Sequence, residues 1–503
     1  RYSANNEKTN NISIDRSRVS YGSSGIFFDN PYSTPGNVFS LTNSVVENSY
    51  YYNLYLGSAK NVTIINNNLD RGSSSLEYGY GIMLYNVSDS GNISKNYITQ
   101  RNGSQGGIYL NSCNGSSTRQ LKVYNNFISV RSASGYSYNA LNSYYSSYID
   151  ILNNNLYNAN VSNTGASALY MYEGYYNRLM YNNIVNSGPG NAIFFLSSGK
   201  NMFTKCDRNN YYNGTNPIGS FYSNTITSIS DIKALGYDSN SVNVNPNYKS
   251  FTDLHSYNVD IDGRAKPEPQ ITKDFDGETR SSTTPDVGAD EFRLTATDAG
   301  ISDYIKPTTG TQCMRVVIKN SGTNTLTSAK INWQVNGSTK TQYSWTGSLA
   351  KGDTDIVCLG NITFKRDTLY VLKTWTSAPN GGTDSMTVND TLSTQFYPAM
   401  RGIYTIGGSS PDFTNFTSAV NALNQSGILD SVYFKVRNGT YSEQFVINKI
   451  SGADRLNAIT FESENKDSTK VLLQYNSTSS SSNNYVVKIN GTNGLTFKKM
   501  TIR

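Results

Sequence analysis

The chain has 503 residues, of which only 16% are charged while 39 are tyrosine, and its formal net charge is +6. This length allows several domains, and the low charge indicates a β-rich surface. The lysines and arginines form no run, so nucleic-acid binding through phosphate neutralisation is excluded, and no stretch reaches the roughly 18 apolar residues of a membrane span.

From about residue 10 to residue 214 the chain repeats one short pattern. An apolar residue is followed by two polar residues, an asparagine, any residue and a second apolar residue, as in Ile64 to Leu69 and Ile93 to Ile98. A second phrase, a small residue followed by alternating apolar positions, lies in each period, as in Gly107 to Leu110. Such short strands cannot bury their apolar sides alone, so residues 1–214 are predicted to form a parallel β-solenoid of stacked coils.

The asparagine of each coil has a physical role. Its side-chain amide can donate to and accept from the same residue in the coils above and below, and asparagine tolerates the left-handed bend of a coil corner. We therefore expect an interior, structural ladder, begun by Ser17. Its predicted members are Asn43, Asn67, Asn96, Asn126, Asn154, Asn182 and Asn209.

Residues 215–292 lose the repeat and are rich in proline and in turns. We expect this segment, with a short helix near 230–235, to cap the exposed end of the solenoid, because repeat proteins need such a cover.

Two acidic phrases in this cap region, Asp260-Ile-Asp-Gly263 and Asp274-Phe-Asp-Gly277, place oxygen ligands at alternate positions before a turn glycine. Calcium loops do the same, and Asp286, Asp290 or Glu291 could complete the shell. Neither phrase has the full twelve-residue calcium loop, so aspartate-glycine turns that simply end the solenoid remain the alternative. No other cofactor is expected.

Residues 293–397 contain half a dozen short strands with turns between them, and Trp333 and Trp345 can fill a core. They predict an immunoglobulin-like β-sandwich. Cys313 and Cys358 lie at positions that suit neighbouring antiparallel strands, where they form either a disulfide or two small core residues. Cys113 and Cys206 lie about three coils apart, too far for a disulfide, and are expected to be free thiols.

Residues 398–503 begin with a helical pattern in which Phe416, Val420 and Leu423 fall on one face, and strand phrases follow. A helix before rising coils is how a new solenoid starts. This block is therefore predicted to be the N-terminal part of a second parallel β-helix.

Three phrases carry a family resemblance: Pro285-Asp-Val-Gly-Ala-Asp-Glu-Phe292, Ile331-Asn-Trp-Gln-Val-Asn-Gly337 and Gly407-Gly-Ser-Ser-Pro-Asp-Phe413. They resemble multidomain secreted or cell-surface proteins of Bacteroidota. Those proteins combine right-handed parallel β-helices of the pectin-lyase-like, choice-of-anchor type with immunoglobulin-like adhesion domains. The resemblance covers nearly the whole chain. It implies that the protein is extracellular or on the cell surface. It implies no chemistry, because the fold family includes both lyases and inert fibres.

The sequence offers no catalytic constellation. A polysaccharide lyase needs a cation or arginine beside a proton-abstracting base, and a glycosidase needs two facing carboxylates. The basic residues of the solenoid lie in different coils, and the single histidine, His255, is interpreted as structural. We expect a non-catalytic structural or adhesive segment. The alternative is a carbohydrate-active β-helix, a lyase or glycan-binding module, and tyrosine doublets such as Tyr144-Tyr145 are either stacking platforms for sugars or ordinary coil packing.

Two expectations concern partners and modification. Open strand edges near Asn11 to Val19 and Leu495 to Arg503 predict head-to-tail assembly with copies of itself or adjacent repeats of a parent chain, with surface glycans as further partners. The resemblance also implies O-glycosylation where an aspartate precedes Ser or Thr and an aliphatic residue. These positions are Thr368, Ser385, Thr391 and Ser431, with Ser468 as a looser match.

Overall fold

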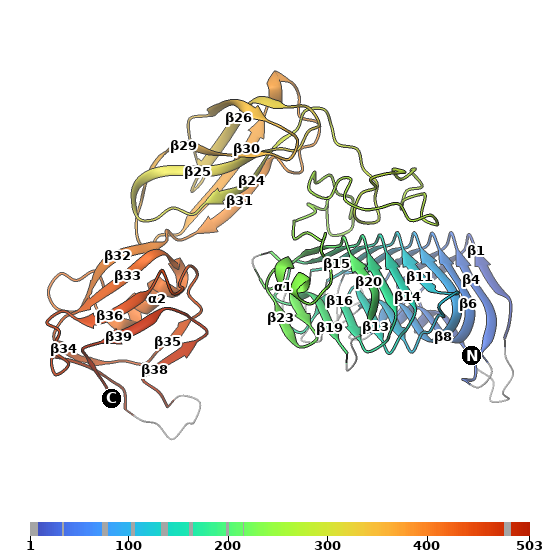
Figure 1. The fold of residues 1–503 in the computed structure, drawn as a ribbon, viewed down its shortest axis with the longest axis horizontal. Helices are drawn as coiled ribbons and strands as arrows, with labels where there is room; N and C mark the ends of the chain where they lie inside the picture. Colours follow the sequence, from blue (N-terminus) through green and yellow to red (C-terminus); the bar gives the residue numbers. More distant parts are fainter. Residues whose placement is uncertain are drawn as a thin grey trace. The chain divides into compact units, whose positions relative to one another are not determined.

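The computed structural model describes residues 9–32, 35–72, 79–101, 106–131, 139–159, 164–197, 201–214, 216–476 and 484–503. Strands make up 51% of the chain and helices 4%, so the predicted all-β class is confirmed. The chain divides into two compact units, Arg1–Leu294 and Thr295–Arg503 (Figure 1). The predicted boundary at residues 292 and 293 lies close to this division.

The first unit is a parallel β-solenoid, as predicted, and each coil contributes strands to three faces. Strands on the first face include β1 (Ile12–Asp15), β4 (Gly36–Thr42), β11 (Leu121–Tyr124), β14 (Ile149–Leu152), β17 (Asn177–Met180) and β20 (Phe203–Asp207). The second face holds β2 (Arg18–Ser20), β5 (Val45–Glu47), β7 (Asn68–Asp70), β9 (Tyr97–Gln100), β12 (Phe127–Val130), β15 (Asn155–Asn158), β18 (Asn183–Asn186) and β21 (Asn210–Tyr212). The third includes β3 (Ser24–Asp29), β10 (Gly106–Asn111), β13 (Leu141–Tyr144), β16 (Ser167–Tyr172) and β19 (Asn191–Leu196). Two long strands, β6 (Tyr52–Ile65) and β8 (Tyr80–Ser94), run from the third face into the first.

Apolar side chains at matching positions of successive coils form the core of this unit. Ile93, Val123, Ile151 and Leu179 are neighbours in register on the first face and are fully buried. Burial of such a side chain stabilises by about 1.5–3 kcal/mol. A single coil has no second layer to cover these residues, so the repeat folds only as a stack.

The asparagine ladder runs through the interior, with one correction. From Asn96 to Asn209 each amide oxygen accepts from the backbone and side chain of the preceding rung; for example, Asn126 Nδ2 donates to Asn154 Oδ1 at 2.9 Å. Asn43 is not a rung. It is exposed, and Ser44 takes the interior place, accepting from Ser17 N and donating its own N–H to Asn67 Oδ1.

The left-handed bend of each corner lies one residue earlier than predicted. Positive φ angles of 49–62° occur at the residues that directly precede the rungs: Arg16, Asn43, Asn66, Lys95, Asn125, Asn153, Tyr181 and Arg208. Asn43 was therefore assigned to the ladder one position too early, because asparagine fits both the bend and the rung.

The end of the solenoid is closed by β22 (Gly219–Phe221), β23 (Asn224–Ile226) and α1 (Ile229–Ala234). β22 continues the parallel stack on β19, and β23 turns back antiparallel to it. Phe221, Ile226 and Ile232 are buried in the solenoid core. The solenoid thus extends beyond the predicted boundary at residue 214, and the end cap is made by residues 216–235.

Residues 244–292, here called the strap, do not cover the end. They run back along the side of the solenoid as turns and extended segments (Figure 1). Contacts with widely spaced coils prove the course: Tyr97 Oη donates to Thr252 O, Asn125 Nδ2 donates to Lys273 O at 2.6 Å, and Gly288 N donates to Tyr181 O at 2.7 Å. The prediction of an end cap is wrong for this segment.

The second unit begins with two antiparallel sheets that share one core. One sheet has the order β24 (Ala299–Ile305), β25 (Gly310–Asn320), β29 (Thr354–Phe364). The other has the order β27 (Ser338–Thr339), β26 (Leu326–Val335), β30 (Tyr370–Ser377), β31 (Thr391–Phe396), with β28 (Tyr343–Leu349) also on β26 and a short 3₁₀ helix η1 (Pro379–Gly381) after β30. Trp333 and Trp345 are buried between the sheets.

A disulfide joins Cys313 on β25 to Cys358 on β29, with their Cα atoms 5.7 Å apart. Of the two possibilities that the sequence left open for this pair, the structure has the disulfide. Cys113 and Cys206 are free thiols, both buried in the first unit.

The rest of the second unit is a second set of parallel coils. Its three sheets have the orders β32 (Met400–Ile406), β33 (Ile428–Val436), β36 (Ile459–Ser463), β39 (Leu495–Lys498); β34 (Gly439–Ser442), β37 (Val471–Gln474), β40 (Thr501–Ile502); and β35 (Phe445–Asn448), β38 (Val487–Asn490). Helix α2 (Phe416–Ser426) lies between β32 and β33 along the chain and buries Phe416, Val420 and Leu423, the face that the sequence indicates. Its N-cap is Asn415, whose side chain accepts from Ser418 N.

Candidate functional site

The strap is held on the solenoid by a second row of asparagines, which the sequence analysis missed. Asn155, Asn183 and Asn210 follow the ladder residues directly and are hydrogen-bonded to one another from coil to coil. Asn155 also donates to Leu254 O and accepts from Ala289 N, while Asn183 donates to Val287 O. The available signal was the doubled asparagine of three successive coils, since one amide is enough for a ladder: Asn154-Asn155, Asn182-Asn183 and Asn209-Asn210.

Gly288 sits where the strap lies closest to this row. Its φ is +108°, and a Cβ atom there would lie 2.3 Å from both Asn155 Oδ1 and Asn183 Nδ2. Only glycine fits both demands. The phrase around Val287-Gly288-Ala289 is thus a docking motif for the solenoid.

Basic side chains of the solenoid are fixed on the strap. Arg178 bridges Asp150 at 3.1 Å and Glu268 at 2.5 Å. Lys122 Nζ donates to Gln270, and Arg208 Nη1 donates to the carbonyl oxygen of Arg264 at 2.9 Å. These cations therefore serve the docking of the strap, and the structure does not gather them around a substrate groove.

Three carboxylates of the predicted calcium shell hold the turns of the strap. Asp274 accepts from the backbone N–H groups of Glu278 and Glu291, and Asp286 accepts from those of Gly263 and Phe292. Glu291 accepts from Ser281 N and Asp286 N and pairs with Arg280 at 3.3 Å. Of the predicted ligands, the structure brings Asp276 and Asp290 together.

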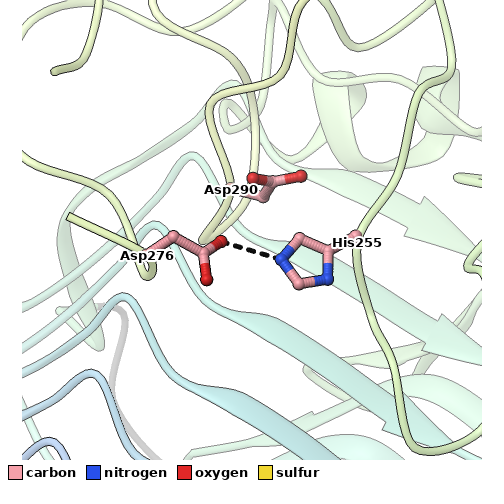
Figure 2. A group of neighbouring side chains, drawn as sticks. All are labelled: His255, Asp276 and Asp290. Carbon is pink, nitrogen blue, oxygen red and sulfur yellow. Dashed lines mark hydrogen bonds and ion pairs between the residues drawn. The ribbon is translucent and has the colours of Figure 1, made fainter. Parts of the chain in front are cut away.

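Asp276 and Asp290 lie close to His255 (Figure 2). The three residues line an open, polar cavity of about 850 Å³ together with Tyr257, Lys273 and Arg293. His255 Nε2 lies 2.8 Å from Asp276 Oδ2, and its Nδ1 bonds Asp253. The ring packs edge-on against Phe127 of β12, with centroids 4.9 Å apart. The histidine therefore has acidic companions, which the sequence analysis did not expect.

Electrostatics make this group an ion network. Burial alone would lower the pKa of His255, but hydrogen bonds to Asp276 and Asp253 raise it above its ordinary value. Burial raises the pKa of Asp290 to about 7, against the opposing charge of His255. A protonated imidazole donates from both nitrogens and has no lone pair for a metal. In this form the group binds the strap together, and a metal would have to displace its proton.

Several outer aromatic rings pack between coils, while Tyr145, Tyr175 and Tyr176 are exposed. Tyr170 of β16 and Phe194 of β19 are neighbours in register and stack at 5.1 Å with an interplanar angle of 2°. Tyr144 and Tyr172 stack at 4.7 Å, and Phe27 and Tyr55 at 4.5 Å. Rings stacked face to face present mainly their edges outward, whereas a sugar-stacking platform needs an exposed face.

The predicted glycosylation residues differ in exposure. Ser385, Thr391 and Ser468 are exposed, while Thr368 and Ser431 are half-buried. The aspartates that precede two of them, Asp384 and Asp390, turn inward and meet Asp298. Sequence analysis missed this second acidic group, because Asp298 is far from the other two along the chain.

Comparisons with known proteins add little. No family model and no curated protein matches the chain. One solved structure, the CARDB domain of a Pyrococcus furiosus protein in complex with di-metal ions, is similar at 15% identity over 22% of this chain and 95% of that one. Its TM-score is 0.18, so it carries no argument about this chain. Among the described residues, no helix is long and apolar enough to cross a membrane.

Proposed function

We propose that this chain is a non-catalytic structural or adhesive segment of a large extracellular or cell-surface fibre. The observation that carries the proposal is the use of the solenoid side chains: interior amides and outer rings pair with their equivalents in the next coil, and basic residues bind the strap. Such pairing builds a rigid rod and leaves few polar groups for chemistry.

The outermost described coils support end-to-end assembly. Ile489 on β38 is 56% exposed although its in-register neighbour Ile447 is fully buried, and Ile502 on β40 is 44% exposed above the buried Leu473. In the first described coil of the first unit, Ile14 and Val19 are half-buried beside the buried Leu41 and Val46. These interior columns would be completed by a further coil, from an adjacent repeat or a second copy.

The disulfide supports an oxidising compartment, because such bonds are rare where thiols are kept reduced. We further propose that the middle block is immunoglobulin-like and that the chain belongs with the secreted Bacteroidota proteins it resembles, with O-glycans on its aspartate-containing motifs. A calcium ion at Asp276 and Asp290 stays a prediction.

Light scattering of the purified chain over a range of concentrations tests the assembly. The mass should rise above 55.4 kDa with concentration. The change Ile489→Lys, which puts a charge in the open column, should abolish the rise. Ile403→Lys is the matched control, because Ile403 is 62% exposed but lies on the outside of β32. A constant monomer mass, or equal loss in both variants, would contradict assembly through this end.

The alternative, a carbohydrate-active β-helix, is favoured by one observation, the polar cavity with His255, Asp276 and Asp290. Incubation with uronate-containing glycans separates the two functions. An unsaturated product absorbing near 235 nm, lost in Asp276→Asn, would establish a lyase. Binding without product, lost in the same variant, would establish a glycan-binding module.

A further inference from the structure

The second acidic group lies in the antiparallel block, between the start of β24 and the segment that joins η1 to β31. One carboxylate oxygen each from Asp298, Asp384 and Asp390 lies within 4.8 Å of the others. Two oxygens bound to one Ca²⁺ are at most about 5 Å apart, since each Ca–O distance is about 2.3–2.6 Å. The spacing therefore suits a shared cation.

Three buried oxygens in this group have no hydrogen-bond partner. They are Asp298 Oδ2, Asp390 Oδ1 and Asn389 Oδ1. Asp298 is 1% exposed and Asp390 9%. A buried acceptor without a partner has lost its hydration and gained no hydrogen bond, which costs more for a charged oxygen than for a neutral one. A positively charged ligand would satisfy these three oxygens of Asp298, Asn389 and Asp390.

The remaining atoms hold these oxygens in place. Asn389 Nδ2 donates to Asp298 Oδ1 at 2.9 Å, which holds these two side chains together. Asp384 accepts from Ala299 N at 3.1 Å and Met386 N at 3.0 Å. Asp390 is anchored through its backbone, because Thr376 N on β30 donates to its carbonyl oxygen. The ligands thus come from a fixed frame of two segments.

The group lacks a compensating charge of its own. The charged groups that shift the pKa values of these carboxylates are the carboxylates themselves: Asp384 acts on Asp298, and both act on Asp390. No lysine, arginine or histidine of the described residues is among those causes. Burial is the largest cause and raises the pKa of Asp298 and of Asp390 to about 7. The strap group differs, since His255 is part of it.

We propose that Asp298, Asp384, Asp390 and the side-chain oxygen of Asn389 bind a calcium ion that ties the segment before β31 to the start of β24. Carboxylate and amide oxygens alone, without nitrogen or sulfur, are the ligands of a hard cation, and backbone carbonyls or water complete the six to eight positions that Ca²⁺ takes. Mg²⁺ requires a tighter octahedron and binds more weakly here.

Calorimetric titration and thermal unfolding of the chelator-treated full chain test this site. Calcium chloride up to about 10 mM, above the range of extracellular calcium modules, should raise the unfolding temperature of the antiparallel block by about 4 °C or more. Asp298→Asn and Asp390→Asn should each abolish this shift. Asp303→Asn is the matched control, an exposed aspartate on β24, and should keep it.

Three results would overturn the proposal: no shift in the wild-type chain, an equal shift in wild type and both site variants, or an equal response to magnesium. If the variants fail to fold, amide exchange in residues 296–301 and 383–391 of the wild-type chain decides. Calcium chloride should slow exchange in both segments, and magnesium chloride should not. Exchange that calcium leaves unchanged would contradict the site.

Discussion

The two units stack their coils with different side chains. In the first unit, directional hydrogen bonds fix each interior amide. Asn154 accepts from Asn126 and donates to Val123 O, Leu152 O and Asn182. In the second, Phe461 stacks between Phe434 at 4.6 Å and Phe497 at 5.0 Å. An amide ladder therefore loses buried hydrogen bonds, and with them stability, when one rung is removed. An aromatic column needs only volume and apolar surface.

Removal of one rung of the amide ladder should have the largest effect on stability. Asn154→Leu keeps the size of the side chain but removes the buried acceptor of the Asn126 N–H and the buried donor to Val123 O and Leu152 O. We expect the free energy of unfolding of the first unit to fall by about 3–5 kcal/mol. Denaturant unfolding with hydrogen exchange over residues 139–159 measures it.

Asn43→Gly is the matched control for the ladder. Asn43 is exposed and has a φ of +50°, which glycine adopts freely, so its loss should cost less than about 0.5 kcal/mol. Equal costs at the two positions would contradict the corrected ladder.

The disulfide should matter to the second unit alone. It closes a loop with a sequence separation of 45 residues, and the double change Cys313→Ser/Cys358→Ser should lower the stability of the antiparallel block by about 2–4 kcal/mol. Calorimetry of the oxidised and reduced chain measures this, with the reductant expected to have no effect on the double variant. A reductant-dependent change in the first unit would show that its buried thiols are not free.

The aromatic column should tolerate a change that the amide ladder does not. Phe461→Leu keeps an apolar side chain in the column and should cost about 1–1.5 kcal/mol. Tyr433→Leu, on the exposed side of β33, is the control and should stay within about 0.5 kcal/mol. A loss at Phe461 as large as that at Asn154 would remove the distinction between the two units.

The smallest expected effect concerns pH and the strap. The pKa of Asp290 is raised to about 7 by burial, so its contribution favours the folded state below its ordinary pKa and is lost as pH rises through 7. The raised pKa of His255 acts in the same direction. Amide exchange in residues 253–292, corrected for the intrinsic rate, should speed up between pH 5.5 and pH 8.5. Asp290→Asn should reduce this dependence and stabilise the strap at pH 8.5 by on the order of 1 kcal/mol. An unchanged profile in the variant would contradict the assignment.

The sequence predicts the repetitive parts of the fold well and the strap poorly. Coil period, buried columns and the helix around Val420 follow from local periodicity, which each coil repeats. The course of the strap depends on single contacts such as Gly288 against Asn155 and Asn183, which join residues more than 100 positions apart. Turn-rich sequence fixes local bends but not the surface on which the segment lies.

The candidate sites divide in the same way. The acidic phrases of the strap are visible in the sequence because their residues are adjacent, yet Asp274 and Asp286 serve backbone turns. The group of Asp298, Asp384 and Asp390 has no local signature, because β24 and the segment before β31 meet only in the folded block.

Electron microscopy of the purified chain beside Ile489→Lys tests the structural role most directly. We expect wild-type particles to join through their ends into longer rods as concentration rises, while Ile489→Lys particles stay single and Ile403→Lys particles join as the wild type does. Single wild-type particles at every concentration, together with turnover of a glycan, would contradict it.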